Sequence, residues 1–190
     1  MQAMNKHGAE AEAVYYSAME SLIGPLTLCA TEQGLCLIEF GPFEETRGQA
    51  EKWLAAQLGR VELLPGDEQL AGVRLQLAEY FEGRRRDFDL PLDMRGTPFQ
   101  LQVWAALRNI PYGASASYKE IAQAVGNVKA VRAVGGANNR NPVPVIVPCH
   151  RVIGAAGALV GYAGGLGIKS RLLELEAGES ARDGAGIYLF

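Results

Sequence analysis

The sequence predicts an α+β protein made of two units, a small α/β unit followed by a mainly helical one. Three observations predict this class. Alternating apolar segments typical of strands occur only in the first half, the second half has apolar residues at helical spacing, and a segment with proline and glycine separates the two. We place the units at 1–90 and 97–178, with a linker at 91–96 and a tail at 179–190.

The first unit is predicted from the periodicity of its apolar residues. Alternation indicates strands, and apolar residues three or four positions apart indicate helices. In chain order these are strands at 13–19, 23–30 and 35–40, a helix at 45–58, a strand at 61–64 and a helix that begins at Asp67 and ends at Gly83. The second and third strands flank a turn that contains Gly34, which predicts a β-hairpin. The basic triplet at 84–86 could contact phosphate, but an exposed helix end is the commoner meaning of such a triplet.

The second unit opens with two strong helix-start signals. Thr97 is a suitable N-cap and Pro98 follows it at the first helical position. Ser117 and Glu120 form a capping box that opens a short helix, which we expect to end at Gly126. Both signals place helices on either side of the proline and glycine at 111–113.

A second short helix is expected directly after Gly126, with Asn127 as its cap. Its inner face would carry Val128, Val131 and Val134, and its outer face Lys129, Arg132 and Gly136. Two short helices joined by a tight turn, the second with a basic outer face, indicate a helix-turn-helix.

The charge of the chain is unevenly distributed. The net charge is −3 overall, but it is −8 over residues 1–94 and +6 over residues 95–176. Because phosphate binding requires local positive charge rather than a high overall pI, the second unit is the candidate DNA-binding part.

The number and spacing of cysteines and histidines argue against a metal site and against disulfide bonds. The chain has 3 cysteines and 2 histidines, without the spacing of a metal site, and an odd cysteine count argues against a disulfide framework. We therefore expect no metal and no cofactor. No apolar run approaches the roughly 20 residues of a membrane span, so we expect a cytoplasmic or otherwise intracellular protein that does not bind membranes.

One stretch, residues 141–154, carries the candidate nucleophile. The β-branched run at 145–147 predicts a short buried extended segment because prolines flank it. Pro148 then fixes the backbone before Cys149. A thiol attacks as thiolate, and His150 is the adjacent candidate base that would remove its proton.

The sequence Pro-Cys-His-Arg-Val at 148–152, after Asn-Pro-Val-Pro at 141–144, resembles the active-site motif of the O6-alkylguanine-DNA alkyltransferases. The resemblance extends over about 97–178. It implies a ribonuclease-H-like first unit and a winged-helix-like second unit. It also implies a monomeric DNA repair protein that flips O6-alkylguanine out of double-stranded DNA and transfers the alkyl group irreversibly to its own cysteine, once per molecule.

The resemblance also assigns roles to single residues. Cys149 would be the nucleophile, His150 its base acting through a water molecule, Glu176 the acid that orients the histidine, Asn141 a hinge, and Tyr118 a donor to guanine N3. The spacing of Glu176 supports its role, because it shares a helix face with the apolar Leu172 and Leu173 and a carboxylate there needs a partner.

The remaining expected residues contact DNA or line the base pocket. Arg132 would fill the space left by the flipped base. The other DNA contacts would be Lys129, Ala133, Gly135, Gly136 and Ala137, and the pocket would be lined by Pro144, Val152, Tyr162, Ala163 and Gly164. Guanine's exocyclic amine would donate to the backbone of Cys149 and Val152.

Two other functions remain open at this point. A non-catalytic module that only binds the lesion would resemble the same family, but such proteins lack the nucleophilic cysteine. A cysteine hydrolase could use Cys149, His150 and Glu176 as an acyl-transfer triad. It would leave Tyr118, Arg132 and the positive second unit without a role.

Overall fold

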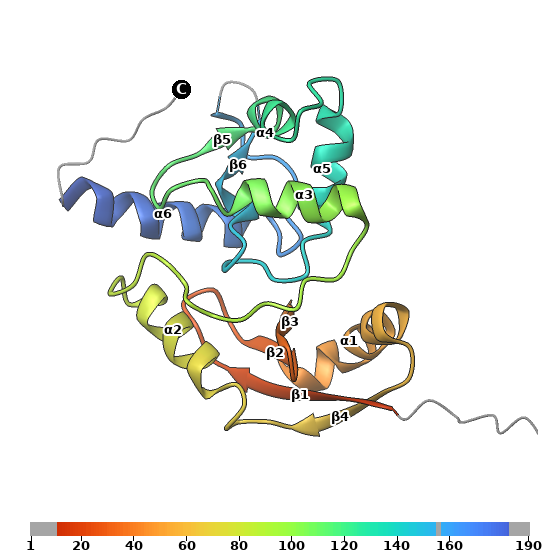
Figure 1. Ribbon diagram of the computed structural model, residues 1–190. Helices are drawn as coiled ribbons and strands as arrows, with labels where there is room; N and C mark the ends of the chain where they lie inside the picture. The colour runs from red at the N-terminus through yellow and green to blue at the C-terminus, as the bar shows by residue number, and fades with distance from the viewer. Residues whose placement is uncertain (1–10, 155–156, 183–190) are drawn as a thin grey trace, which may run out of the picture.

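The computed structural model describes residues 11–154 and 157–182, with the side chains of 179–182 excepted. It is an α+β molecule whose sheet half and helical half lie against each other (Figure 1). The sheet half contains β1 (Glu12–Met19), β2 (Leu26–Thr31), β3 (Gly34–Phe40), α1 (Phe43–Leu58), β4 (Val61–Pro65) and α2 (Ala71–Phe81). The helical half contains α3 (Pro98–Leu107), β5 (Ala116–Ser117), α4 (Tyr118–Ala124), α5 (Val131–Asn139), η1 (Cys149–Arg151), β6 (Val152–Ile153) and α6 (Leu166–Arg182).

The four-stranded sheet has the order β3-β2-β1-β4. The predicted hairpin is confirmed, since β2 and β3 pair antiparallel from Leu26–Phe40 to Thr31–Gly34. β1 pairs antiparallel with β2 and parallel with β4. The strand β2 begins three residues later than expected, after a turn at Gly24, whose φ is +99°.

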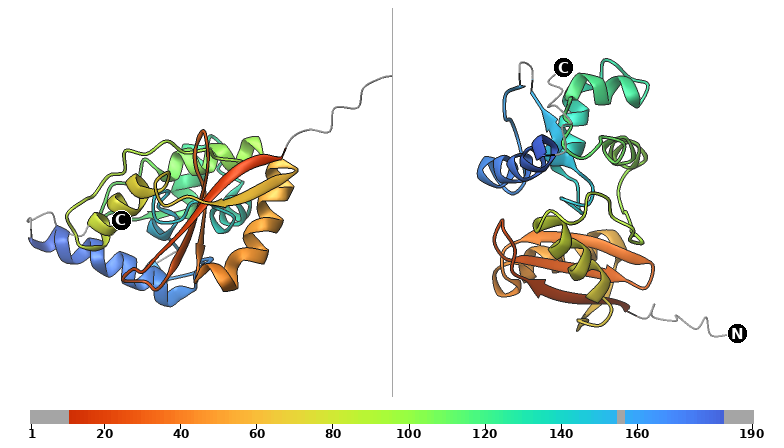
Figure 2. Two further views of the ribbon diagram at one scale, coloured as in Figure 1. Left: turned by 90° about the horizontal axis from the view of Figure 1, so that it is seen from below. Right: turned by 90° about the vertical axis from the view of Figure 1, so that its left-hand side faces the viewer.

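The two faces of the sheet serve different cores. Cys29 and Leu37 pack with Ala50 and Leu54 of α1 in the smaller cluster. The opposite face contributes Leu26, Leu28 and Ala30 to a larger cluster, which also contains side chains of α2, α3, α5 and α6. The two halves therefore share one hydrophobic core, and Figure 2 shows the helical half lying against the sheet half from two further directions.

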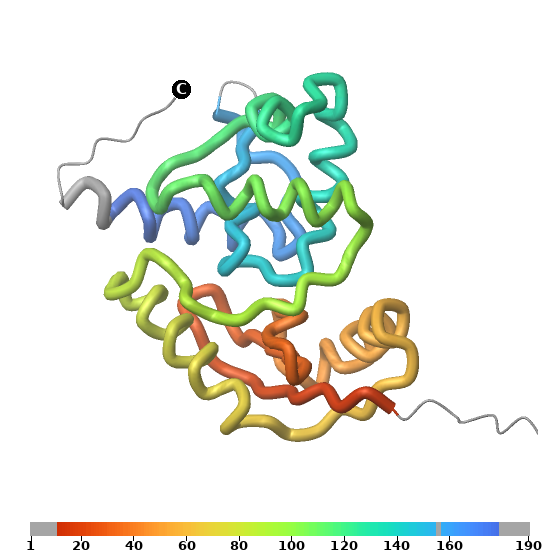
Figure 3. The backbone as a smooth tube through the Cα atoms, viewed as in Figure 1, coloured from red at the N-terminus to blue at the C-terminus, as the bar shows by residue number. Residues whose placement is uncertain are grey.

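The linker is bonded to the edge of the sheet. It runs between the halves as the segment that follows α2 (Figure 3). The amide of Leu35 donates to the carbonyl of Pro91 at 3.0 Å, and the amide of Asp93 donates to the carbonyl of Leu35 at 2.9 Å. On the same strand, the amide of Ile38 donates to the carbonyl of Pro142 at 2.8 Å. Strand β3 thus holds both the linker and the segment that leads to Cys149.

The predicted N-cap and the predicted capping box of the helical half are both present, and the N-cap at Thr97 is also part of a capping box. Thr97 and Gln100 close the first turn of α3, with Pro98 at its start, and Ser117 and Glu120 close the first turn of α4. These reciprocal side-chain bonds satisfy amides that a helix leaves unpaired at its N-terminus. Two predicted helix starts are too early, one by four residues and the other by three.

Helix α2 begins at Ala71 and not at Asp67, because residues 67–70 form turns. The side chain of Asp67 instead accepts hydrogen bonds from Ser17 and Arg74. Helix α5 begins at Val131, since Asn127 caps no helix and its carbonyl closes a turn with the amide of Ala130 at 2.9 Å.

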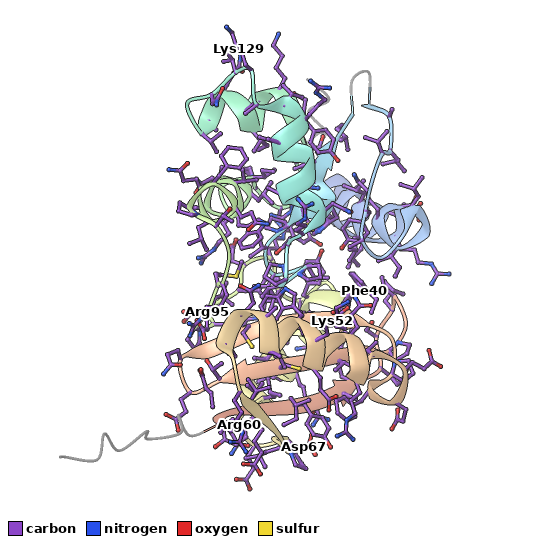
Figure 4. The ribbon with its side chains drawn as sticks, turned by 90° about the vertical axis from the view of Figure 1, so that its right-hand side faces the viewer. Phe40, Lys52, Arg60, Asp67, Arg95 and Lys129 are labelled. Atoms are coloured by element: carbon purple, nitrogen blue, oxygen red, sulfur yellow. The ribbon has the colours of Figure 1, made fainter. Side chains whose placement is uncertain are left out.

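The position of Val128 changes with the start of α5. Its side chain is 57% exposed in the turn before the helix, so the predicted inner face retains only Val131 and the fully buried Val134. Lys129 lies in the same turn, at the outer tip of the helical half and at the opposite end of the molecule from Asp67 (Figure 4).

At the C-terminal end, helix α6 continues to Arg182. The boundary expected at residue 178 therefore falls inside a helix, and residues 183–190 of the expected tail lie outside the described residues. Across residues 11–154 and 157–182, no helix combines the length and the apolar character needed to cross a membrane.

Candidate active site

The segment before Cys149 is a tight buried turn. Residues 145–147 are buried as predicted, but they are not extended. Val145 has a φ of +74°, and the amide of Val147 donates to the carbonyl of Val143 at 3.0 Å. A positive φ is costly for a β-branched residue, so the surrounding structure must enforce it. The turn directs the chain into the short 3-10 helix η1, which begins at Cys149.

Asn141 holds this turn together with three hydrogen bonds. Its Nδ2 donates to the carbonyl of Val147 at 2.8 Å and to Sγ of Cys149 at 3.1 Å. Its Oδ1 accepts from the amide of Val143 at 3.1 Å. The expected hinge asparagine is thus placed to fix both the backbone of the turn and the sulfur atom, directly after α5.

The thiol of Cys149 is buried, with 3% of the residue exposed. Burial raises its pKa to about 11, against the opposing effects of the Asn141 amide and the positive charge of Lys169. A buried thiol reacts only if a nearby base accepts its proton. The other two cysteines are also buried, and burial raises their pKa further, to about 12 for Cys36.

His150 and Glu176 form the expected pair. Nε2 of the histidine lies 2.9 Å from Oε1 of the carboxylate, and both side chains are almost completely buried. Burial alone would raise the pKa of Glu176, but the hydrogen bonds and charges of His150 and Arg151 lower it to about 2. The carboxylate is therefore ionised and can only accept, so Nε2 of His150 must carry the proton.

The other ring nitrogen of His150 is the one available for proton transfer. Nδ1 is buried and has no hydrogen-bond partner among the described residues. Burial lowers the pKa of His150, so the ring is kept neutral and Nδ1 retains a lone pair. A neutral imidazole with an unprotonated ring nitrogen can accept a proton, as a general base must.

Sequence reasoning missed Arg151, which is 6% exposed. Its Nε and Nη2 donate to Glu176 at 3.0 and 2.9 Å, and its Nη1 donates to the carbonyl of Ile110 at 2.6 Å. The sequence could have indicated its role, because a charged residue inside the largely apolar stretch at 145–153 needs a buried partner. Glu176 is thus the partner of two consecutive residues, His150 and Arg151.

Lys169 is a second missed residue, and its side chain is completely buried. Its Nζ donates to the carbonyls of Val152 at 2.6 Å and Val160 at 2.9 Å. The lysine therefore ties the strand after Cys149 to the loop before α6. The carbonyl of Val152, which we expected to accept from guanine, already accepts this hydrogen bond.

Tyr118 lies at the start of α4 and faces the same loop. Its hydroxyl donates to the carbonyl of Val160 at 3.3 Å. Partial burial and the charge of a Cys149 thiolate raise the pKa of Tyr118, so the hydroxyl stays protonated and able to donate.

Four of the five DNA-contact candidates on α5 are accessible, and one is not. Arg132 and Ala133 are exposed, and Gly135 and Gly136 are partly exposed. Ala137 is 2% exposed, and its carbonyl accepts from Nε1 of Trp104 at 2.9 Å. Its assignment as a DNA contact is wrong, because it lies on the face of α5 that packs against α3.

The residues expected to line the base pocket also differ in their exposure. Pro144 and Tyr162 are buried, whereas Ala163 is exposed. A side chain added at Gly164 would meet the ring of Phe40 at 2.9 Å, so this glycine faces the sheet half. A groove of about 660 Å³ between the halves is lined by Pro144, Ala163 and Phe40 among others.

Comparisons with known proteins agree with this geometry. Residues 14–94 match the ribonuclease-like domain of 6-O-methylguanine DNA methyltransferase, and residues 98–178 match its DNA-binding domain. The methylated-DNA--protein-cysteine methyltransferase of Methanosarcina acetivorans is 46% identical over 163 residues, which is 86% of this chain and 98% of the relative. The constitutive enzyme of that name from Bacillus subtilis is 60% identical over 108 residues, 56% of this chain and 66% of the relative.

Solved structures show the same relationship. The crystal structure of Mycobacterium tuberculosis OGT in complex with DNA aligns with a TM-score of 0.75 at 44% identity, covering 87% of this chain and 94% of that one. The O6-methylguanine-DNA methyltransferase of Pyrococcus kodakaraensis aligns with a TM-score of 0.61 at 27% identity, covering 86% and 98%. Both halves of the chain are matched, and the chain belongs to the 6-O-methylguanine DNA methyltransferase family.

Proposed function

We propose that Cys149 accepts the alkyl group when this protein, a methylated-DNA--protein-cysteine methyltransferase, repairs DNA. The observation that carries the assignment is the buried series of Cys149, His150 and Glu176, in which Nδ1 of the histidine has no partner among the described residues. A water molecule between Nδ1 and Sγ would pass the thiol proton to the ring. The imidazolium so formed would be stabilised by Glu176 at 2.9 Å.

The substrate that fits this site is O6-alkylguanine in double-stranded DNA. The thiolate attacks the carbon attached to O6, so the S–C bond forms as the C–O bond breaks. Guanine leaves with the electron pair of the broken bond, and we assign to the hydroxyl of Tyr118 a hydrogen bond to N3 of the departing base. The product is a thioether, which water does not hydrolyse, so each molecule acts once.

A paired base must leave the duplex before Cys149 can reach it. The exposed Arg132 on α5 is the side chain that we assign to the space left by the base, with Lys129, Ala133, Gly135 and Gly136 as further contacts to DNA. The second half carries the positive charge that phosphate binding requires. We propose that the protein works as a monomer and acts on DNA in the cytoplasm.

The flipping role of Arg132 can be tested with two substrates. Unstacking a base costs a few kcal/mol in a duplex and nothing for a free base. We expect Arg132→Ala to slow transfer from duplex DNA by about tenfold or more and to leave the reaction with free O6-benzylguanine nearly unchanged. Rate constants for both substrates would be measured by intact mass, with Arg171→Ala, an exposed arginine on α6, as the matched control.

Equal losses on the two substrates would show that Arg132 does not act by replacing the flipped base. Binding of duplex DNA without any gain in mass would instead support the lesion-binding module as the function.

A further inference from the structure

One side chain from the sheet half reaches the carboxylate of the proposed relay. Tyr80 lies in the last turn of α2, 96 residues before Glu176 in the sequence. Its hydroxyl donates to Oε1 of Glu176 at 2.7 Å, and neither residue is more than 1% exposed. Helices α2 and α6, from the two halves of the molecule, lie next to each other where this contact forms (Figures 1 and 2).

The hydroxyl of Tyr80 shares its acceptor atom with His150. Oε1 of Glu176 accepts from Tyr80 and lies 2.9 Å from both Nε2 of His150 and Nη2 of Arg151. Oε2 accepts from the amide of Gly113 and from Nε of Arg151, each at 3.0 Å. Every donor to a carboxylate oxygen takes up part of its negative charge. The donor from Tyr80 therefore weakens the interaction of that oxygen with the histidine.

The packing of the Tyr80 ring determines where its hydroxyl points. The ring meets Phe81 and Tyr112 edge-on, with centroids 5.4 and 6.0 Å away, and it lies tilted against Phe88 at 5.3 Å. These three aromatic neighbours surround the ring and hold the hydroxyl towards Glu176. Burial and the nearby Glu176 raise the pKa of Tyr80 well above its usual range, so the hydroxyl remains a donor at every physiological pH.

We propose that Tyr80 is a positioning residue through which the sheet half controls the basicity of His150. The inference rests on the proposed relay of Cys149, His150 and Glu176. With Tyr80 in place, Oε1 stabilises the imidazolium less strongly, and His150 stays neutral and able to accept a proton at lower pH. The ionisable groups that face the His150–Glu176 pair are Arg151, Lys169, Cys149, Tyr80, Tyr112 and Tyr162.

The test is the pH dependence of methyl transfer from O6-methylguanine duplex DNA, measured between pH 5 and 9. In Tyr80→Phe the ring remains but the donor is lost, so the pKa of His150 rises. We expect the acid limb of the profile to move up by about half a pH unit, which lowers the rate on that limb, below the pKa of His150, by about threefold, while the alkaline plateau stays close to that of the unmodified protein.

A second variant keeps the protein folded and reverses the effect. 3-Fluorotyrosine incorporated at position 80 retains the ring and has a more acidic hydroxyl, so it donates more strongly and should move the acid limb to lower pH. The control for stability is Val73→Ala, which removes a buried side chain from the same helix. It should lower the melting temperature without moving the acid limb.

The outcomes separate this inference from the proposed function. The positioning role is wrong if the acid limb does not move in either position-80 variant. If the melting temperature is then lowered as in Val73→Ala, Tyr80 is a structural contact. If Glu176→Gln still changes the profile in that case, the relay stands. If Glu176→Gln also has the rate and profile of the unmodified protein, the relay itself is wrong.

Discussion

At the scale of single residues, the site depends on keeping one buried acid ionised. Glu176 is 1% exposed and accepts from Tyr80, His150, Arg151 and the amide of Gly113. Desolvation of a carboxylate favours its neutral form, and the hydrogen bonds and charges of His150 and Arg151 reverse this effect. The sequence predicted Glu176 and His150, because a carboxylate on an apolar helix face needs a partner. It could not predict Tyr80, which folding brings next to Glu176 from a distant helix.

This balance predicts how the stability of the protein depends on Glu176. The pKa of Glu176 is lowered from 4.5 to about 2 on folding, so its contribution is complete above about pH 4.5 and is lost as the pH falls towards 2. Glu176→Gln leaves Arg151 buried without its charged partner and should reduce the free energy of unfolding at pH 7 by about 3–5 kcal/mol. The difference between the two proteins should become smaller between pH 5 and pH 3.

Urea denaturation at several pH values measures both effects. Glu174→Gln is the control, because Glu174 lies on the exposed side of the same helix, where its carboxylate accepts from the hydroxyl of Ser170 at 2.6 Å. A stability difference for Glu176→Gln that is as small as that of the control would contradict the assigned balance.

At the scale of the elements, local signals predicted most of the structure. The hairpin, the N-cap at Thr97, the capping box at Ser117 and the helix that carries Glu176 follow from patterns within a few residues. The wrong predictions concern segments whose conformation depends on contacts with residues outside the segment. Residues 145–147 have strand propensity, but Asn141 folds them into a turn with a positive φ at Val145. A position such as Gly164 gives no sequence signal that its neighbour is Phe40.

The hairpin turn at Gly34 shows how one element positions another. Gly34 has a φ of +143°, and a side chain there would lie 2.3 Å from the carbonyl oxygen of Pro91. Gly34→Ala should therefore displace the linker from β3. Gly24 also has a positive φ, of +99°, but has no neighbouring atom within 4 Å of such a side chain. Comparing Gly34→Ala with Gly24→Ala therefore separates the effect of the contact with Pro91 from the effect of backbone strain.

We expect Gly34→Ala to be less stable than Gly24→Ala by about 2 kcal/mol in urea denaturation, which is typical of an overpacked contact. The same loss in both variants would indicate that only the backbone conformation matters and that the linker does not constrain Gly34.

At the scale of the whole molecule, the sheet half supports the reaction site of the helical half. Strand β3 binds the backbone at Pro142 and Pro91, and α2 supplies Tyr80 to Glu176. Side chains from both halves form one core. The core is shared, but the charge is not: the excess of positive charge lies in the half that carries α5 and Cys149. The helical half contains the DNA-binding domain, and in our proposal the sheet half fixes the relay.

The central claim is that a single cysteine accepts the alkyl group from DNA. Its most direct test is intact mass followed by peptide mapping after incubation with O6-methylguanine duplex DNA. We predict a stable gain of one methyl group per molecule, located on Cys149, with Cys29 and Cys36 unmodified and no gain in Cys149→Ala. A methyl group on Cys29 or Cys36, or full methylation of the Cys149→Ala protein, would contradict the account.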